Sequence, residues 1–213
     1  MPSKNYLAKV LTFALALVAL VLASAAVAAS DTDTHDPAVS ETNCVRASND
    51  GEHNNLHAGE VEGTEADDAI HGSVGNDHVN AYHGNDVVIA GSGDDDVHGG
   101  SGDDILCGGS GNDHVAGDAG HDDLNGNVGN DNLTGDTGND VEHGGAGSDH
   151  LVGGLGNDHL TGGAGHDTII AGAGSDHVNA KDGHVDQVNC GAGVDHVTAD
   201  MSDVLKGCEI VKH

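Results

Sequence analysis

A nine-residue pattern of hydrophobic and polar positions runs through most of the chain. One aliphatic residue stands between two mostly polar neighbours, as in "HVA" and "HLT", and six glycine-rich residues lead to the next aliphatic. This alternation predicts a short strand with one buried face. A strand of three residues is too short to be stable alone, so we expect each one to stack on copies of itself.

Aspartate keeps the same period as the aliphatic residue. Glycine stands two residues before twelve of these aspartates, and an aliphatic stands two residues after twelve of them; Ala66 and Glu142 are the exceptions. An internal repeat of fixed period indicates a solenoid. The thirteen aspartates at strict nine-residue spacing are Asp68, Asp77, Asp86, Asp95, Asp104, Asp113, Asp122, Asp131, Asp140, Asp149, Asp158, Asp167 and Asp176.

The six residues between strands are predicted to form a tight turn. Where the second turn position is not glycine in the middle repeats, it is Asp118, Asn127 or Asp136. Because Asn and Asp tolerate a positive φ better than other non-glycine residues, a left-handed backbone is expected there. Two turn-strand units then make one eighteen-residue coil, with strands stacked at about 4.8 Å. The predicted fold class is all-β, a right-handed parallel β-roll (β-solenoid) of nonapeptides with terminal caps.

This geometry places aspartates that are eighteen residues apart, such as Asp95 and Asp113, on one edge and one rung from each other. Two carboxylates at that distance repel unless a cation lies between them. Tight glycine turns also direct carbonyl oxygens inward, and carboxylate and carbonyl oxygens are the hard ligands that suit Ca²⁺. Several Ca²⁺ ions are therefore expected, with binding coupled to folding because the unfolded chain has no preformed site.

The N-terminal residues have the pattern of a secretory signal peptide. Lys4 and Lys9 flank an apolar run that ends in small residues, with cleavage expected after Ala28 or Ala29. The alternative is an uncleaved membrane anchor, since the run is nearly long enough to span a bilayer. We expect an extracellular, secreted protein that has no membrane attachment after cleavage.

The charge of the chain is strongly negative. It has 36 acidic and 6 basic residues, a formal net charge of −30, no Trp, one Phe and two Tyr. Such a chain repels nucleic acid and anionic lipid and attracts cations. Low hydrophobicity with high charge normally gives disorder, so folding requires something that neutralises the charge. A high-salt habitat would also favour this acidity.

Four stretches, "GGSGDDILC", "GGSGNDHVA", "GGLGNDHLT" and "GGAGHDTII", match G-G-x-G-x-D-x-U-x. The chain therefore resembles the RTX, or haemolysin-type, calcium-binding repeat proteins over roughly residues 63–189. The resemblance implies a parallel β-roll with calcium ions between consecutive loops on each edge. The loops that end at Asp68, Asp77 and Asp86 are degenerate. The implied metal ligands are Asp77, Asp86, Asp95, Asp104, Asp113, Asp122, Asp131, Asp140, Asp149, Asp158, Asp167 and Asp176.

The expected organisation is a signal peptide (1–29), an N-terminal segment or cap (30–62), the calcium-binding roll (63–189) and a C-terminal cap (190–213). The signal peptide departs from the resemblance, because RTX toxins and proteases usually leave the cell by a route read from the C-terminus. A separate toxin or protease domain is not expected, since residues 30–62 are too few. The tail resembles the ending of many exported repeat proteins, and solenoids require caps.

Four cysteines in an exported chain favour two disulfides. Cys190 and Cys208 are eighteen residues apart, one coil, and a rung spacing of about 4.8 Å lies within the reach of a disulfide. They are therefore expected to pair, which leaves Cys44 to join Cys107.

The chain also has seventeen histidines, many at outward strand positions. The simpler interpretation is that they are solvent-facing polar residues that limit the charge density. The alternative is that His78, Asp96, His98 and His114, on three successive rungs, bind Zn²⁺, Cu²⁺ or Ni²⁺. His159 and His177 are likewise one rung apart.

An enzyme is not expected. The serines lie mainly in turns without a G-x-S-x-G elbow, and a regular roll offers no cleft for paired catalytic carboxylates. Ice binding is disfavoured because the outward positions form no regular Thr or Asn array. The preferred interpretation is a structural or adhesive extracellular module whose partner is a cell-surface or matrix component. The alternative is a soluble metal sink or sensor in which the histidines bind transition metals.

Overall fold

The structure is a computed structural model that describes residues 59–213. In this part the chain forms two nine-stranded sheets, and successive strands alternate between them. One sheet contains β1 (Glu60–Thr64), β3 (His78–Tyr82), β5 (Asp96–Ser101), β7 (His114–Ala119), β9 (Asn132–Thr137), β11 (His150–Leu155), β13 (Thr168–Gly174), β15 (Gln187–Gly193) and β17 (Val204–Lys206). The other contains β2 (Ala69–His71), β4 (Val87–Ser92), β6 (Ile105–Ser110), β8 (Asp123–Val128), β10 (Val141–Ala146), β12 (His159–Ala164), β14 (His177–Ala180), β16 (His196–Ala199) and β18 (Ile210–Lys212).

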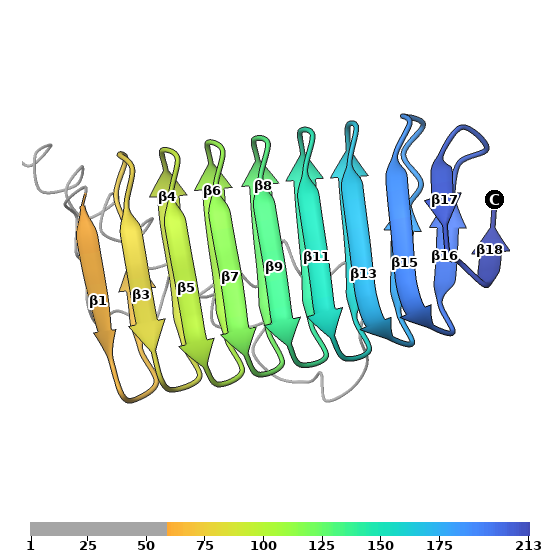
Figure 1. The fold of residues 1–213 in the computed structure, drawn as a ribbon. Coiled ribbons are helices and arrows are strands. Elements are labelled where there is room, and N and C mark those ends of the chain that lie inside the picture. The colour runs from red at the N-terminus through yellow and green to blue at the C-terminus, as the bar shows by residue number, and fades with distance from the viewer. Residues whose placement is uncertain (1–58) are drawn as a thin grey trace, which may run out of the picture. The chain divides into compact units, whose positions relative to one another are not determined.

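Neighbouring strands in each sheet are parallel and come from consecutive coils (Figure 1). Val97 of β5 pairs with Val115 of β7, a separation of eighteen residues. The same register joins the strands from β1 to β12, and it confirms both the eighteen-residue coil and the parallel β-roll. Nearer the C-terminus the separation changes: Thr168 pairs with Gln187, because the turn before β15 is one residue longer.

The strands are longer than the sequence pattern predicted. The strands from β4 to β12 each have six residues rather than three, because the glycine pair after the aliphatic residue stays in the ladder. Gly109, for example, pairs with Gly91 in the preceding coil and with Asn127 in the next one. The turn between strands is therefore only three residues long, and it ends at the aspartate that recurs every nine residues.

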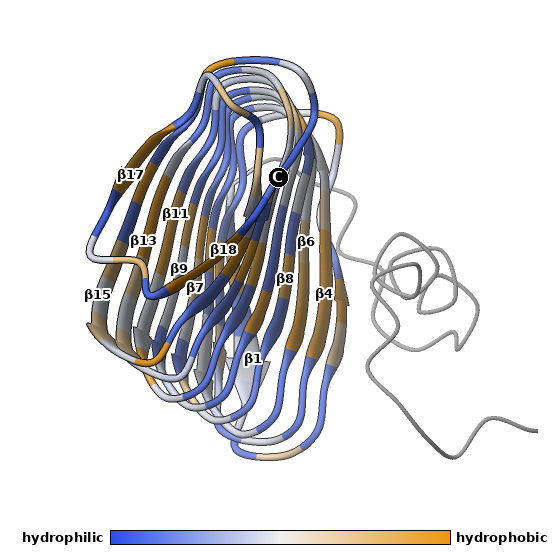
Figure 2. Ribbon diagram, turned by 90° about the vertical axis from the view of Figure 1, so that its right-hand side faces the viewer, coloured by the Kyte–Doolittle hydropathy of each residue, from blue (hydrophilic) through white to orange (hydrophobic). Residues whose placement is uncertain are grey.

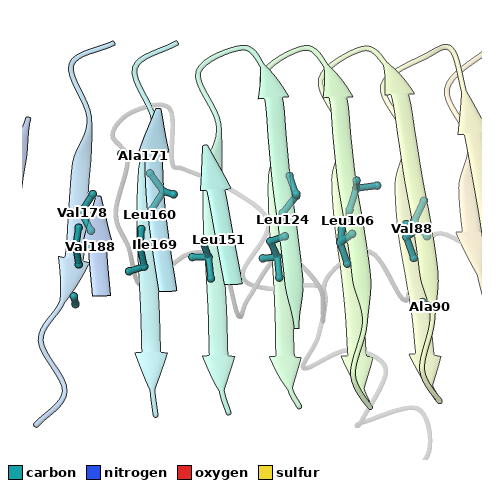
Figure 3. Packing of buried hydrophobic residues seen from close by; sticks show 14 of the residues in the cluster. Val88, Ala90, Leu106, Leu124, Leu151, Leu160, Ile169, Ala171, Val178 and Val188 are labelled. Carbon is teal, nitrogen blue, oxygen red and sulfur yellow. The ribbon is translucent and has the colours of Figure 1, made fainter. Parts of the chain in front are cut away.

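The core lies between the two sheets and consists of two rows of aliphatic side chains, one row from each sheet. Figure 2 shows the hydrophobic positions as bands that cross both sheets, and Figure 3 shows Val88, Leu106 and Leu124 in successive coils. Leu106 and Val115 are both fully buried, as predicted. Because full burial of such a side chain stabilises by about 1.5–3 kcal/mol, the stack of repeats supplies a core that a single strand cannot.

Glu142 interrupts the row of aliphatic residues that comes from the even-numbered strands. It pairs in register with Leu124 on one side and Leu160 on the other, and its side chain is fully buried. Its Oε1 accepts a hydrogen bond from the Gly135 backbone amide at 3.1 Å. Oε2 is buried without a hydrogen-bond partner, and burial raises the pKa of Glu142 well above its usual range. The core thus contains one carboxyl group at a position built for leucine.

The left-handed turn positions are confirmed. Asp118, Asn127 and Asp136 have φ values of 69°, 70° and 67°. The other equivalent residues from Gly91 to Gly172 are glycines with positive φ, and Tyr82 adopts a φ of 77° at the same position in an N-terminal loop, so the repeat imposes this conformation even on a residue that disfavours it.

The C-terminal disulfide is also confirmed. Cys190 and Cys208 are bonded, with their Cα atoms 5.2 Å apart. Paired strands continue through the segment interpreted as a cap, and side-chain exposure increases in β17 and β18. Cys44, the predicted partner of Cys107, lies outside the described residues, as do the predicted signal peptide and most of the N-terminal segment. Among residues 59–213, no helix is long and apolar enough to cross a membrane.

Candidate metal sites at the two edges of the roll

The roll collects the predicted aspartates into two rows, one at each edge where the chain turns between sheets. One row precedes the odd-numbered strands and the other precedes the even-numbered strands. All of these side chains are at most 3% exposed. The first row is Asp77, Asp95, Asp113, Asp131, Asp149 and Asp167, and the second row is Asp86, Asp104, Asp122, Asp140, Asp158 and Asp176.

One oxygen of each carboxylate is satisfied by the preceding coil. The backbone amide of Asp95 donates to Oδ1 of Asp113 at 2.9 Å, and the amide of Asp113 donates to Oδ1 of Asp131 at 2.8 Å. The same bond repeats along both rows. Backbone amides therefore order the carboxylates, a contact that the sequence pattern did not indicate.

The other oxygen, Oδ2, is buried without a hydrogen-bond partner from Asp86 onward. An ionised carboxylate oxygen withdrawn from water is costly unless a cation or a donor replaces the solvent. The residues with such an Oδ2 are Asp86, Asp95, Asp104, Asp113, Asp122, Asp131, Asp140, Asp149, Asp158, Asp167, Asp176, Asp186 and Asp195. Each row therefore contains regularly spaced carboxylate oxygens that have neither a hydrogen-bond donor nor access to water.

Glycine at the first position of the repeat leaves room beside this oxygen. A Cβ placed on Gly135 would lie 2.5 Å from Oδ2 of Asp140 and 2.8 Å from the carbonyl oxygen of Gly153 in the next coil. The equivalent position at Gly99 lies near Oδ2 of Asp104 and the carbonyl oxygen of Gly117. At these two glycines a carboxylate oxygen and a carbonyl oxygen lie beside the space, and no nitrogen or sulfur atom is among the nearest atoms.

Burial changes the acidity of these groups. Desolvation raises the pKa of Asp122 to about 8 and that of Asp131 to about 7, although the backbone hydrogen bonds to Oδ1 oppose the shift. Asp113 and Asp158 are raised to about 6 for the same reason. Nearby carboxylates of the same row add to the shift. Ionising these carboxylates at neutral pH therefore has a free-energy cost in the folded chain, and a bound cation would remove that cost.

The N-terminal end of the rows is different. Oδ2 of Asp77 accepts hydrogen bonds from the backbone amide and the hydroxyl of Ser73, at 2.7 and 3.0 Å. Oδ2 of Asp68 is bonded in the same way by Thr64. These two loops were identified as degenerate from the sequence. In them a hydroxyl residue satisfies the oxygen that lacks a partner elsewhere.

Two further aspartates continue the rows beyond the strict nine-residue period. The amide of Asp167 donates to Oδ1 of Asp186 at 2.8 Å, and the amide of Asp176 donates to Oδ1 of Asp195 at 3.0 Å. They fall outside the nine-residue period of the sequence, because the longer turn shifts them by one residue. The D-x-V pattern in "DQVN" and "DHVT" was the available signal.

The residue before each aspartate forms a second, outer ladder that the sequence analysis missed. Oδ1 of Asp94 accepts from the backbone amide of Asn112, whose own Oδ1 accepts from the amide of Asn130. On the other edge, Asn139 accepts from the amide of Asn157. The frequency of Asn and Asp at this fifth repeat position was the signal. These side chains are exposed, and they brace each turn against the next.

The donor set fits Ca²⁺. It consists of carboxylate and backbone carbonyl oxygens, which are hard ligands, and the carboxylate oxygens occur once per turn beside the space that glycine leaves open. The residues that would hold calcium are the aspartates with an unpartnered Oδ2, together with carbonyl oxygens of the adjoining glycine turns.

The fold and these two rows define a parallel β-roll with repeated oxygen-donor sites. A family model described as the RTX calcium-binding nonapeptide repeat matches the chain in four copies, over residues 62–97, 84–115, 108–142 and 143–178. These matches cover more than half of the chain, and the chain belongs to this family. Calcium binding by the repeats is thereby supported. No curated protein matches the chain in a sequence comparison.

Proposed function

We propose that this protein is a secreted calcium-binding module whose roll folds when Ca²⁺ binds, and that it acts as a structural or adhesive component outside the cell. The observation that carries the calcium-dependent part is the series of buried Oδ2 atoms without partners. A chain with a net charge of −30 must compress these carboxylates into two rows in order to fold. Calcium offsets both the desolvation and the repulsion, so it favours the folded state.

The direct test is a calcium titration of one matched pair of variants. Asp113→Asn keeps the Oδ1 acceptor for the Asp95 amide but removes the charge at Oδ2. Asp103→Asn removes the same charge from the outer ladder, where Asn already stands at equivalent positions. We expect Asp113→Asn to raise the calcium midpoint for folding and Asp103→Asn to leave it nearly unchanged. Equal midpoints in the two variants would contradict the assignment.

The extracellular and adhesive role rests on the N-terminal sequence and on the regular, polar outer faces of the sheets. N-terminal sequencing of the exported protein is expected to begin near Ser30. A pull-down from cell-surface or matrix fractions is expected to recover a partner in Ca²⁺ but not in chelator, because only the folded roll presents ordered faces.

A soluble metal sink or sensor is the second candidate function. It is favoured by the histidines that line the outer faces of both sheets, and it needs no macromolecular partner. A pull-down without a calcium-dependent partner, together with transition-metal binding, would favour this role over adhesion. Both proposed roles are non-catalytic.

A further inference from the structure

The outer face of the odd-numbered sheet carries a compact group of His and Asp side chains, separate from the two edges. Asp96 and His98 are two residues apart in β5, so both project from the side opposite to the buried Val97. His114 of β7 pairs in register with Asp96. One ligand atom from each of Asp96, His98 and His114 can be chosen so that all three lie within 4.8 Å of one another.

Asp96 and His98 each also contact a residue outside this group of three. Oδ2 of Asp96 lies 3.0 Å from Nδ1 of His78, while its Oδ1 lies 3.5 Å from Nε2 of His98. Nδ1 of His98 lies 3.6 Å from Oδ2 of Asp118. A histidine that binds a metal through one nitrogen commonly donates from the other to a carboxylate, which fixes the ring.

His114 is positioned by Asn132, the next residue along the same row. Its Nδ1 accepts a hydrogen bond from the side-chain amide nitrogen of Asn132 at 2.9 Å. Binding of a metal through Nε2 requires the Asn132 amide to turn, so that its oxygen accepts from Nδ1–H. The three residues are therefore oriented by His78, Asp118 and Asn132. The side chains of His98 and Asp96 are 34% and 45% exposed, so an ion from solution can reach them.

We propose that Asp96, His98 and His114 form a binding site for a first-row divalent transition metal of the Zn²⁺ class, distinct from the calcium sites. Two imidazoles and one carboxylate suit such ions, whereas Ca²⁺ prefers oxygen ligands only. Three protein ligands at an exposed face leave at least one coordination position for water.

A second histidine row lies on the even-numbered sheet and supplies the control. The rings of His159 and His177 are 4.8 Å apart with their planes 3° from parallel, and those of His177 and His196 are 5.0 Å apart at 5°. Nitrogen lone pairs lie in the ring plane, so parallel stacked rings direct them side by side and not toward one point. This row is not expected to form a tight site.

The test is a Zn²⁺ titration of the full chain in saturating Ca²⁺, read by competition with a chromophoric chelator. One tight equivalent is expected in the wild type. His98→Ala and Asp96→Asn are expected to remove it, and Asp118→Asn to weaken it on the order of 10–100-fold, as for residues that position a ligand. His177→Ala should leave the affinity unchanged.

Circular dichroism of the same samples must show the same β content in every variant, since all of these side chains face outward. Substitution with Co²⁺ adds a direct readout, because its visible spectrum should change in His98→Ala and not in His177→Ala. Wild-type affinity in His98→Ala, or an equal loss in His177→Ala, would overturn the proposal. This outcome is independent of the calcium titration, which reads the aspartates at the edges.

Discussion

At the scale of single residues, the first glycine of each repeat has a chemical role as well as a conformational one. Gly117 makes room for Oδ2 of Asp122, which a Cβ at this position would approach to 2.5 Å. A Cβ there would also lie 2.9 Å from the Cβ and 3.0 Å from the Cγ of Asp122, so the whole Asp122 side chain has to shift, but no backbone atom is among these nearest atoms. At Gly102, by contrast, a Cβ would overlap the backbone carbonyl of Gly84.

We therefore predict different results for two glycine-to-alanine substitutions. Gly117→Ala should displace the Asp122 carboxylate and raise the calcium midpoint while the roll still forms at high Ca²⁺. Gly102→Ala should destabilise the roll at any calcium concentration, because it combines a backbone clash with a φ of 140°. Calcium titrations followed by circular dichroism distinguish the two. Identical behaviour of the variants would count against the role given to Oδ2.

Glu142 gives a second prediction at this scale. Its raised pKa means that the folded state favours the protonated form. The resulting contribution to stability is present at low pH and is lost as the pH rises from the unfolded value through the folded one. Glu142→Gln should therefore match the wild type near pH 4.5 and be more stable at pH 8.

Glu142→Leu restores the aliphatic row and should stabilise by about 1–3 kcal/mol at pH 8, the usual cost of a buried unpaired polar group. Denaturant unfolding in saturating Ca²⁺ at the two pH values measures both effects. A lower stability of Glu142→Leu at pH 8 would mean that the buried carboxyl group has a favourable partner, contrary to this account.

At the scale of single elements, each strand from β1 to β16 contributes one large buried side chain, and its stability depends on the strands of the adjacent coils. The C-terminal strands have neighbours on one side only, and β18 is exposed throughout. The Cys190–Cys208 disulfide closes an eighteen-residue segment at this end. A disulfide that closes a loop of this size contributes about 3 kcal/mol.

We predict that replacing both Cys190 and Cys208 with alanine loosens only this end of the roll. Hydrogen exchange should become faster from β15 to β18 and stay unchanged from β5 to β11, because repeats contact only their neighbours. Uniform loss of protection along the roll would show that the coils unfold as one unit and that the disulfide stabilises all of them.

The strand pattern could be predicted from the sequence where the period is strict. The nine-residue spacing of Leu106, Val115 and Leu124 was sufficient to place them in one core, and the eighteen-residue coil followed. Strand length could not be predicted, because glycine has weak strand preference and its pairing depends on the adjacent coils. Asp186 and Asp195 were not predicted as ligands, because a one-residue insertion moves them off the nine-residue spacing. The fold nevertheless gives them the same hydrogen bonds as the other aspartates of the two rows.

At the scale of the whole molecule, the charge of the buried carboxylates determines at which pH and calcium concentration the roll is stable. In the calcium-free protein the buried carboxylates, with pKa values of about 8 for Asp122 and about 7 for Asp131, favour folding when they are protonated. Their contribution is present at low pH and is lost as the pH rises through these values. Bound calcium reverses this dependence, because it keeps the carboxylates ionised and protons then compete with it.

We predict opposite pH trends in two buffers. In chelator, the free energy of unfolding should increase as the pH falls from 8.5 toward 5.5. At a limiting calcium concentration it should decrease over the same interval as the ions are released. Circular dichroism reports both trends as the β content at each pH, because the chain in chelator has no folded baseline for denaturant unfolding at neutral pH. The same trend in both buffers would contradict the proposed role of the aspartates.

The most direct test of the central claim is far-ultraviolet circular dichroism of the full chain during a Ca²⁺ titration at neutral pH. The account predicts the spectrum of a disordered chain in chelator and a β spectrum in millimolar Ca²⁺, the affinity range of extracellular calcium modules. Equal β content in chelator and in calcium would contradict it, because the roll would then form without a cation to compensate its two rows of buried carboxylates.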